Sequence, residues 1–360
     1  MWLYNFLFSV IVFSIIFLNK KNYDSFYKIM FITFFILSFI RWETGTDWET
    51  YYYIFDKKIE DMAYVSEIGF RMINYYVNKL TNNYTILLLL MAAVIYPLKY
   101  LMIKRYSKNI LFSLLIFFSL YKADIFFVRM TVAVAINFYA FNYILKQELI
   151  KFIGFVLLAC IFHRTAIIFL IAYPIVRYIK FTMNKMYCIF FVAIIFYVFN
   201  YEIINLLNLF LKKIDLTFVE NISFKLNLYL ETKNIYFGND QRNLNNSLKM
   251  IITVVNRVFI YVIILWKAKK LDFFSQKSLL LYGIGYSLFF LLTPISVPLG
   301  RLTAYFDIFE LIIIPNIYMT LKNRTIKKLF IMISIVYFYL KLFSGIYTYY
   351  GAFIPYKTIF

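Results

Sequence analysis

The feature that most constrains this chain is a series of long apolar runs, which follow one another almost from end to end. A helix needs about 20 mainly apolar residues to cross the hydrocarbon core of a membrane. Hydrophobic residues make up 63% of the sequence and charged residues 16%, whereas about 25% of residues are charged in soluble domains. Because a soluble fold cannot bury so much apolar surface, the sequence predicts an integral membrane protein.

The apolar runs are continuous, whereas the strands of a transmembrane β-barrel alternate between apolar and polar side chains. We therefore expect an all-α, polytopic transmembrane helical bundle with about 12 membrane segments, including short or broken helices. The chain, 1–360, is expected to form a single integral membrane domain, and Trp2–Leu18 is expected to be a retained first span rather than a signal peptide. The expected spans are 2–18, 28–40, 84–103, 109–121, 129–145, 151–163, 165–177, 186–210, 247–266, 278–296, 302–321 and 328–345.

Lysine and arginine concentrate in the short loops between these runs, and such loops lie on the cytoplasmic side of a membrane. This rule puts both termini outside, on the non-cytoplasmic side of the membrane. Two long loops, about 41–83 and 211–246, then also lie outside. In the first loop, apolar residues recur at helical spacing from Glu67 to Leu80, which predicts an amphipathic helix on the membrane surface.

The net charge of +20 is explained mainly by these loops and by anionic lipid headgroups. Nucleic acid is not an expected partner, because the lysines are scattered between hydrophobic spans. The two cysteines, Cys160 and Cys188, lie inside apolar runs, so neither a disulfide nor a metal site is expected. We expect no cofactor. A few arginines remain as candidates for binding an acidic ligand.

A helix break is predicted at His163-Arg164. If residues 151–177 formed one span, Arg177 and the lysines that follow it would lie outside. A break returns them to the cytoplasm, as the positive-inside rule requires. Each half would then be about 20 Å long, which is short for a full crossing, so His163 and Arg164 are expected within the protein at membrane depth.

The first candidate site follows the second apolar run. Arg41 precedes a glycine turn that is rich in carboxylates and aromatic residues, including Asp47, Trp48 and Tyr51. Aromatic faces beside carboxylates suit sugar rings, through stacking and through hydrogen bonds to hydroxyl groups. An interfacial aromatic belt with solvated charges explains the same residues equally well.

Charged residues at the rim of apolar spans are further candidates, because charge is costly there. Glu67 opens the expected surface helix, although an ordinary pair with Arg71 one turn later explains it as well. Arg129 opens a span on its non-cytoplasmic side, where positive charge is disfavoured. It is expected either to pair with Asp124 or to bind a phosphate.

Two more candidates lie at breaks in the apolar pattern. His163 is the only histidine, and beside Arg164 it is either a structural residue or a base that acts near neutral pH. Arg301 opens another span on the outer side, with Tyr305 one turn further along the same face. A structural hairpin, with Arg301 reaching to the headgroups, is the alternative.

This topology brings four arginines to the outer rim, where the positive-inside rule disfavours them: Arg41, Arg129, Arg164 and Arg301. Guanidinium groups bind phosphates through two parallel hydrogen bonds. The sequence therefore predicts a basic cavity that opens outward and takes a ligand carrying phosphates.

Five short motifs together resemble a known family. They are Gly45-Thr-Asp47-Trp-x-x-Tyr51-x-x-x-Phe55 after Arg41, Glu67-x-Gly69-Phe, Arg129 at a helix start, Ala159-x-x-x-His163-x-Thr165-Ala, and Arg301-x-x-x-Tyr305-Phe. In this order and spacing, over about residues 41–310, the chain is similar to the EpsG-like family of Wzy-type polysaccharide polymerases. No motif matches the loop at 211–246.

The resemblance implies a metal-independent glycosyltransferase of the bacterial inner membrane. Such an enzyme joins repeat units carried on undecaprenyl pyrophosphate into O-antigen or a related surface polysaccharide, on the periplasmic or outer side. Its expected partners are these lipid-linked glycans, membrane lipids, a chain-length regulator and a flippase.

The reaction implied by this resemblance makes two chemical demands. Arg129, Arg164 or Arg301 would stabilise the leaving pyrophosphate. His163, Asp47 or Glu67 would orient or deprotonate the acceptor hydroxyl. Arg41, Trp48, Tyr51 and Tyr305 complete the expected substrate-binding set.

Two other classes of membrane protein fit some of these features. A flippase or transporter of lipid-linked glycans would also use a basic central cavity, but it should have two pseudo-symmetric halves, which the sequence lacks. A membrane acyltransferase that modifies the same polysaccharides would use a histidine base, and His163 alone is weak support for it.

Overall fold

The computed structural model describes residues 1–56, 67–121, 123–126, 129–199, 202–203, 205–206, 209, 242–293 and 297–360. Within these residues every named element is a helix, and the one β feature is an isolated bridge between Arg41 and Thr358. The prediction of an all-α fold is confirmed. The chain divides into two compact units, unit 1 (1–178 with 308–360) and unit 2 (179–307). The single membrane domain stays a prediction.

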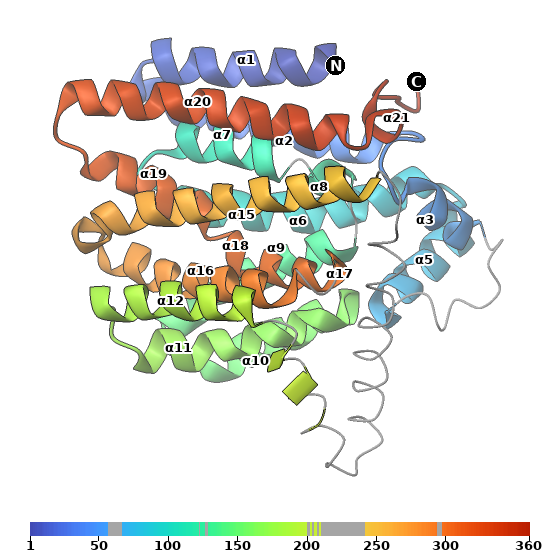
Figure 1. The fold of residues 1–360 in the computed structure, drawn as a ribbon. Coiled ribbons are helices and arrows are strands. Elements are labelled where there is room, and N and C mark those ends of the chain that lie inside the picture. The colour runs from blue at the N-terminus through green and yellow to red at the C-terminus, as the bar shows by residue number, and fades with distance from the viewer. Residues whose placement is uncertain are drawn as a thin grey trace. The chain divides into compact units, whose positions relative to one another are not determined.

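Unit 1 holds both ends of the chain, and its helices are labelled in Figure 1. They are α1 (Trp2–Phe17), η1 (Lys20–Asn22), α2 (Tyr23–Ile40), α3 (Trp48–Phe55), α5 (Ile68–Thr81), α6 (Tyr84–Tyr106), α7 (Ile110–Leu120), α8 (Ala123–Phe126), α9 (Arg129–Leu145), α10 (Leu149–Phe162), η2 (Arg164–Ile171), α11 (Ala172–Tyr178), α19 (Glu310–Thr320), α20 (Arg324–Tyr347) and α21 (Tyr350–Phe353).

Two apolar helices, α7 and α9, form the core of unit 1. Every residue from Leu111 to Ser119 is buried, because α7 contacts α1, α2, α19 and α20. Most of α9 is buried between α6 and α10. A helix that is apolar on all sides is buried in a protein core or lies in lipid, and here the neighbouring helices cover most of α7 and α9.

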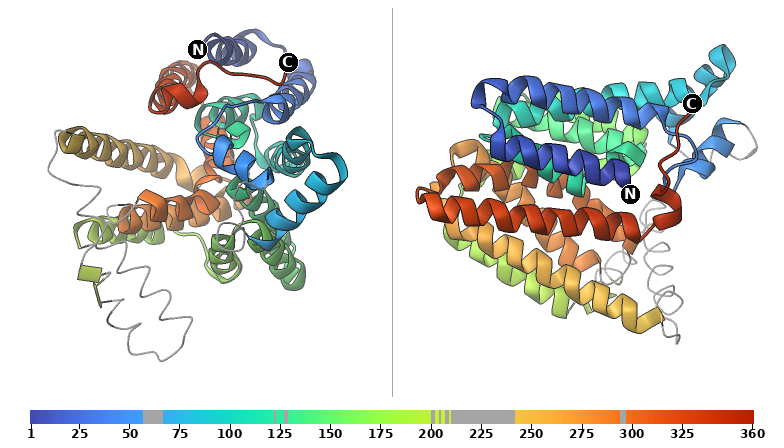
Figure 2. Two further views of the ribbon diagram at one scale, coloured as in Figure 1. Left: turned by 90° about the vertical axis from the view of Figure 1, so that its right-hand side faces the viewer. Right: turned by 90° about the horizontal axis from the view of Figure 1, so that it is seen from above.

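Both chain ends lie at the end of unit 1 that carries α3 and α5 (Figure 2). The Tyr4 hydroxyl donates to the Phe353 carbonyl at 2.9 Å, and the rings of Phe8 and Tyr339 lie 5.2 Å apart. The expected topology puts the same three features, both termini and the 41–83 loop, on one side of the membrane. Which side of a membrane this is stays a prediction.

Unit 2 is built around α16 (Phe273–Leu292), which contacts α12 (Met183–Val198) and α18 (Ala304–Asp307). Tyr261 of α15 (Arg242–Lys267) stacks on Tyr286 of α16, with ring centroids 4.1 Å apart. The close approach of α18 requires Gly285, because a Cβ there would lie 2.6 Å from that of Phe306. The remaining elements are η3 (Ala268–Lys270), α17 (Val297–Gly300) and η4 (Arg301–Thr303).

The predicted number of membrane segments is not confirmed. Among the described residues, three helices are long and apolar enough to cross a membrane, or up to four if one bent pair counts as a single span. The three are Lys20–Ile40, Tyr84–Tyr106 and Arg324–Tyr347. Four other predicted spans form apolar helices of 10–17 residues, namely α1, α7, α10 and α12. The apolar helices indicate a membrane protein.

Two predictions about local structure are confirmed. The helix break occurs at His163, whose backbone is extended (φ −154°, ψ 112°) between α10 and η2. The amphipathic helix is α5, which buries Phe70 and Val77 and exposes Met72 and Leu80.

Parts of the two long segments predicted to lie outside, 41–83 and 211–246, form helices, and their location outside the membrane stays a prediction. In the first segment, residues 48–55 form α3. Most of the predicted loop 211–246 lies outside the described residues, but α15 already begins at Arg242. Residues 57–66 of the first loop and 294–296 before Arg301 also lie outside the described residues.

Candidate functional site

A single carboxylate joins three parts of unit 1 that are distant in the sequence. Glu67, directly before α5, accepts a hydrogen bond from Arg129 Nη1 at 2.8 Å through one oxygen. Its other oxygen accepts from the backbone N–H of Arg164 at 3.3 Å. The carboxylate therefore ties the first residue of α9 to the break between α10 and η2.

Arg129 is held on several sides. Its Nε donates to the Tyr51 hydroxyl at 3.3 Å, and its guanidinium carbon lies 5.2 Å from the Tyr51 ring and 5.6 Å from the Phe70 ring. The side chains of Arg129 and Glu67 are 19% and 13% exposed. A charge-assisted pair with so little exposure, flanked by aromatic rings, fixes the orientation of the guanidinium.

The two ion pairs that the sequence offered as alternatives, Glu67–Arg71 and Arg129–Asp124, are not formed among the described residues. Glu67 pairs with Arg129 instead of Arg71, whose backbone N–H alone bonds the Glu67 carbonyl. Asp124 pairs with Lys99 of α6 at 2.5 Å, and the two side chains are 2% and 1% exposed. A carboxylate buried this deeply needs a cation. Since Lys99 provides it, Arg129 pairs with Glu67.

Tyr51 supports Arg129 as a neutral phenol. Burial raises the pKa of Tyr51 above its usual 10.0, and the nearby Arg129 charge opposes this rise without cancelling it. The phenol therefore stays protonated at neutral pH. It serves as a hydrogen-bonding and stacking partner for the guanidinium, rather than as a base.

The His163-Arg164 break brings a histidine and an exposed cation next to this carboxylate. His163 Nδ1 lies 2.6 Å from the Thr165 hydroxyl, and the histidine is partly buried. The carbonyl of Ala166 accepts from Asn137 of α9 at 3.1 Å, which anchors the start of η2. The Arg164 backbone is tied to Glu67, whereas its side chain is exposed.

Arg41 does not project at the outer rim as the sequence predicted. Its side chain is 1% exposed, and it donates from Nε to the Ser38 carbonyl at 3.2 Å and from Nη1 to the Thr44 carbonyl at 2.7 Å. The C-terminal segment holds the same turn, because Trp42 N–H donates to Lys357 and Gly45 N–H to Ala352. Arg41 therefore stabilises main-chain carbonyls of a turn and is not open to a ligand.

The aromatic residues after this turn stack on one another. The Trp48 side chain is 6% exposed, and its ring is parallel to that of Tyr52 at 4.9 Å and packs edge-on against Trp42. Trp48 therefore offers no exposed ring face, in the described structure, for the predicted stacking of a sugar. Asp47 precedes α3 and is half-buried, and its side chain caps no N–H group of that helix.

Unit 2 contains a polar cluster that the sequence analysis missed. Arg257 of α15 donates to both oxygens of Asp307, from Nη1 at 2.7 Å and from Nη2 at 2.6 Å. The Thr303 hydroxyl donates to the same carboxylate at 2.6 Å, and the Arg257 guanidinium carbon lies 4.1 Å from the centre of the Phe289 ring. The signal was present, since Arg257 is an arginine within the apolar run 247–266.

The two predicted site residues of this unit differ in exposure. Arg301 opens η4 and is exposed, whereas Tyr305 of α18 is 0% exposed. Tyr305 thus belongs to the packed interior of the described structure, and Arg301 is the residue of this pair that a ligand can reach. Its role as a pyrophosphate ligand stays a prediction.

Comparison with known proteins identifies the family but no individual relative. No curated protein and no solved structure matches this chain. The sequence pattern that defines the EpsG family matches residues 24–358, which include both the Glu67–Arg129 cluster and Arg301. The chain therefore belongs to the EpsG family, and this membership indicates a polymerase-like role in membrane polysaccharide biosynthesis.

Proposed function

We propose that this chain is a glycosyltransferase that polymerises repeat units linked to undecaprenyl pyrophosphate into O-antigen or a related surface polysaccharide, on the outer side of the inner membrane. The observation that carries the proposal is the Glu67 carboxylate, which joins the Arg129 guanidinium to the His163-Arg164 break. One cluster thus combines cations suited to a pyrophosphate with a base suited to a hydroxyl group. Membership of the EpsG family supports the general role.

The reaction moves the growing chain from its lipid carrier onto the next repeat unit. A hydroxyl oxygen of the acceptor sugar attacks the anomeric carbon of the donor and forms the new glycosidic bond. The bond from that carbon to the pyrophosphate oxygen breaks, and its electron pair leaves with the lipid pyrophosphate. The hydroxyl proton passes to His163, the general base.

The arginines divide into a ligand-binding and a positioning role. Arg164 is exposed and binds the pyrophosphate, whose developing negative charge it stabilises. Arg301, an exposed arginine of unit 2, is proposed to bind phosphate as well. Arg129 and Glu67 are largely buried partners, and they act by holding the His163-Arg164 segment in place. Asp47 is half-buried and orients the acceptor hydroxyl.

The helix that follows Glu67 supplies an apolar surface for the lipid carrier. Along α5, Ile68, Met72, Tyr75 and Tyr76 are each more than half exposed. These side chains and Arg71 line a shallow pocket. An isoprenoid chain lying on this face would bring its pyrophosphate close to the residues at the start of the helix. This arrangement supports a donor that carries both a long apolar chain and a phosphate group.

The proposal is tested with the purified full-length protein in lipid nanodiscs and its lipid-linked repeat unit as substrate. The expected products are a ladder of polymer lengths and free undecaprenyl pyrophosphate. His163→Ala and Arg301→Ala should both abolish the ladder while the protein remains folded. Normal ladders from both variants would overturn the assigned site.

A deletion strain separates the polymerase from the flippase alternative. Loss of a polymerase leaves a core that bears a single repeat unit. Loss of a flippase leaves no repeat unit at all, and loss of an acyltransferase leaves the chain length unchanged. Only the first outcome supports the proposed function.

A further inference from the structure

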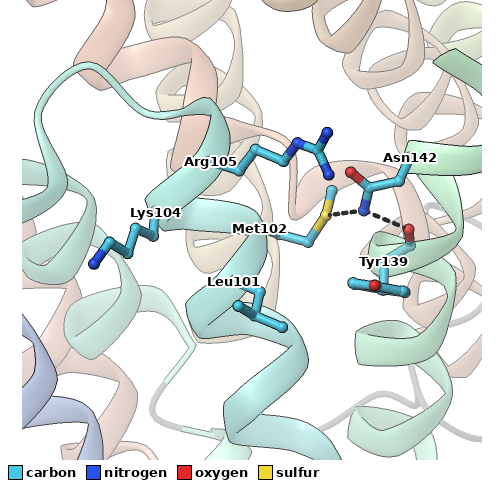
Figure 3. A pocket seen from close by; sticks show the side chains of 6 residues that line it. All are labelled: Leu101, Met102, Lys104, Arg105, Tyr139 and Asn142. Carbon is cyan, nitrogen blue, oxygen red and sulfur yellow. Dashed lines mark hydrogen bonds between the residues drawn. The ribbon is translucent and has the colours of Figure 1, made fainter. Parts of the chain in front are cut away.

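A second basic site lies at the other end of α9 from Arg129. A pocket of ≈ 220 Å³ opens between the last turns of α6 and α9, lined by Leu101, Met102, Lys104, Arg105, Tyr139 and Asn142 (Figure 3). Asn142 follows Arg129 by 13 residues of one helix, which corresponds to about 20 Å. The pocket is therefore separate from the Glu67–Arg129 cluster within the same unit.

The charge of this pocket is positive. Among the described residues, Lys104 and Arg105 are the charged residues that line it, and no carboxylate does. Lys104 contacts Asp24 at 3.2 Å, but the two side chains are 44% and 65% exposed, and such surface pairs are weak. Arg105 is exposed, its guanidinium carbon lies 5.5 Å from the Tyr106 ring, and it forms no ion pair with another described residue. Its guanidinium can therefore take an anion.

The floor of the pocket carries a hydrogen-bond donor with a weak partner. Asn142 is 4% exposed, and its amide nitrogen donates to the Tyr139 carbonyl and to the Met102 sulfur, each at 2.8 Å. Its amide oxygen accepts from the Tyr106 hydroxyl at 2.6 Å, which fixes the orientation of the amide. A thioether is a poor acceptor, so a phosphate oxygen can replace it at low cost. In Figure 3 the Arg105 guanidinium extends toward this amide.

The position of the pocket, at the end of an apolar helix, favours a lipid over a small soluble anion. α6 is apolar and long enough to cross a membrane, and Lys104 and Arg105 lie in its last turn. Leu101, one turn earlier, is 49% exposed. Basic residues above an exposed apolar surface match the headgroup and the acyl chain of an anionic phospholipid.

We propose that this pocket binds the phosphate of an anionic membrane phospholipid, with Arg105 as the principal ligand, Lys104 as a second cation, the Asn142 amide as a neutral donor and Leu101 against the acyl chain. The site differs in place and in residues from the proposed polymerase site. The juxtaposition that carries it is an arginine that has no ion pair with another described residue, beside a buried amide at the end of a helix long and apolar enough to span a membrane.

Native mass spectrometry of the full-length protein in detergent tests this site. Phosphatidylglycerol and phosphatidylcholine with identical acyl chains are titrated separately, and the bound lipid is counted. We expect a phosphatidylglycerol adduct that Arg105→Gln weakens about fivefold. The matched control is Lys146→Gln, because Lys146 is an exposed cation one turn beyond Asn142 that does not line the pocket. It should change binding less than twofold.

Three outcomes would overturn the proposal. Equal losses in Arg105→Gln and Lys146→Gln would mean that the lipid senses only diffuse positive charge. Equal binding of phosphatidylcholine would mean that net anionic charge is not recognised. Inorganic phosphate that competes as well as phosphatidylglycerol would mean that the acyl chains contribute nothing. A circular dichroism spectrum of Arg105→Gln identical to that of the wild type excludes misfolding as the cause of lost binding.

Discussion

The Glu67–Arg129 cluster of unit 1 and the Arg257–Asp307 cluster of unit 2 solve the same problem in different ways. Each holds an arginine and a carboxylate that are largely shielded from solvent. Asp307 accepts hydrogen bonds from Nη1 and Nη2 of Arg257 and from the Thr303 hydroxyl, so these bonds stay within one cluster. Glu67 instead divides its oxygens between Arg129 and the backbone of Arg164, whose side chain remains exposed.

The difference shows how an arginine in an apolar protein can serve structure or a ligand. A bidentate pair with a third donor gives both carboxylate oxygens a partner and holds the arginine in a structural role. A carboxylate that bonds a backbone N–H of a helix break leaves the neighbouring side chain available. We therefore expect substitutions in the Arg257–Asp307 cluster to affect mainly stability, and substitutions at the helix break to affect mainly activity.

The largest effect is expected for Arg164→Gln. Removing a cation that stabilises a developing negative charge typically lowers the rate by about 10²–10³-fold. The measurement is the rate of polymer formation in nanodiscs at a fixed amount of folded protein. Arg177→Gln is the matched control, because Arg177 is an exposed arginine of the same unit. Equal rates for the two variants would contradict the role of Arg164.

A large loss of stability is expected for Arg257→Met, which leaves the Asp307 carboxylate without its cation. The free energy of unfolding should fall by about 2–3 kcal/mol, because a mostly buried charge is left unpaired. Thermal unfolding in detergent measures this change. The double variant Arg257→Met with Asp307→Leu should lose less than the sum of the two single variants. Additive losses would show that the pair is not coupled.

Gly45→Ala tests the turn that Arg41 holds through its hydrogen bonds, a structural role that resembles that of Arg257. Gly45 has φ +118°, and a Cβ there would lie 3.0 Å from Arg41 Nη1 and 3.2 Å from Phe126 Cβ. We expect a loss of about 1–3 kcal/mol of stability, measured by thermal unfolding. Gly154→Ala in the middle of α10 is the control, since a Cβ there meets nothing within 4 Å. It should be neutral or stabilise by up to about 1 kcal/mol.

The smallest effect is expected for Tyr51→Phe, which keeps the ring against Arg129 and removes the hydroxyl. The lost hydrogen bond contributes on the order of 1 kcal/mol, so the rate should fall less than tenfold. Because burial raises the pKa of Tyr51 above 10.0, this phenol is protonated throughout pH 6–9. The pH–rate profiles of the variant and the wild type should therefore have the same shape. A changed profile would assign Tyr51 a proton-transfer role.

Several features could be predicted from the sequence because they depend on neighbouring residues. The helix break at His163 follows from charge placement on the two sides of an apolar segment, and the structure has it at that residue. The amphipathic helix follows from an apolar repeat, and α5 covers Ile68–Thr81. The candidate residues Glu67, Arg129 and His163 were found from the cost of charge in apolar spans.

Other features could not be predicted, because their partners are distant along the chain. The sequence predicts Arg41 at the outer rim, but the turn that follows it is hydrogen-bonded to Lys357 and Ala352. Arg257 has its carboxylate 50 residues away, and Glu67 has its arginine 62 residues away. For Glu67 and for Arg257, choosing the nearest opposite charge along the sequence gives the wrong partner or no partner.

The sequence by itself determined the membrane environment, the all-α fold class, the helix break at His163 and the family. Hydrophobicity, charge placement and motif spacing are properties of the sequence that need no knowledge of tertiary contacts. Only the tertiary structure decided which arginines are buried in structural hydrogen bonds and which are exposed. That decision depends on which oxygen atoms the packed helices bring within about 3 Å of each guanidinium. The apolar runs therefore predicted a membrane bundle, whereas the packing of α5, α9 and η2 assembled its candidate active site.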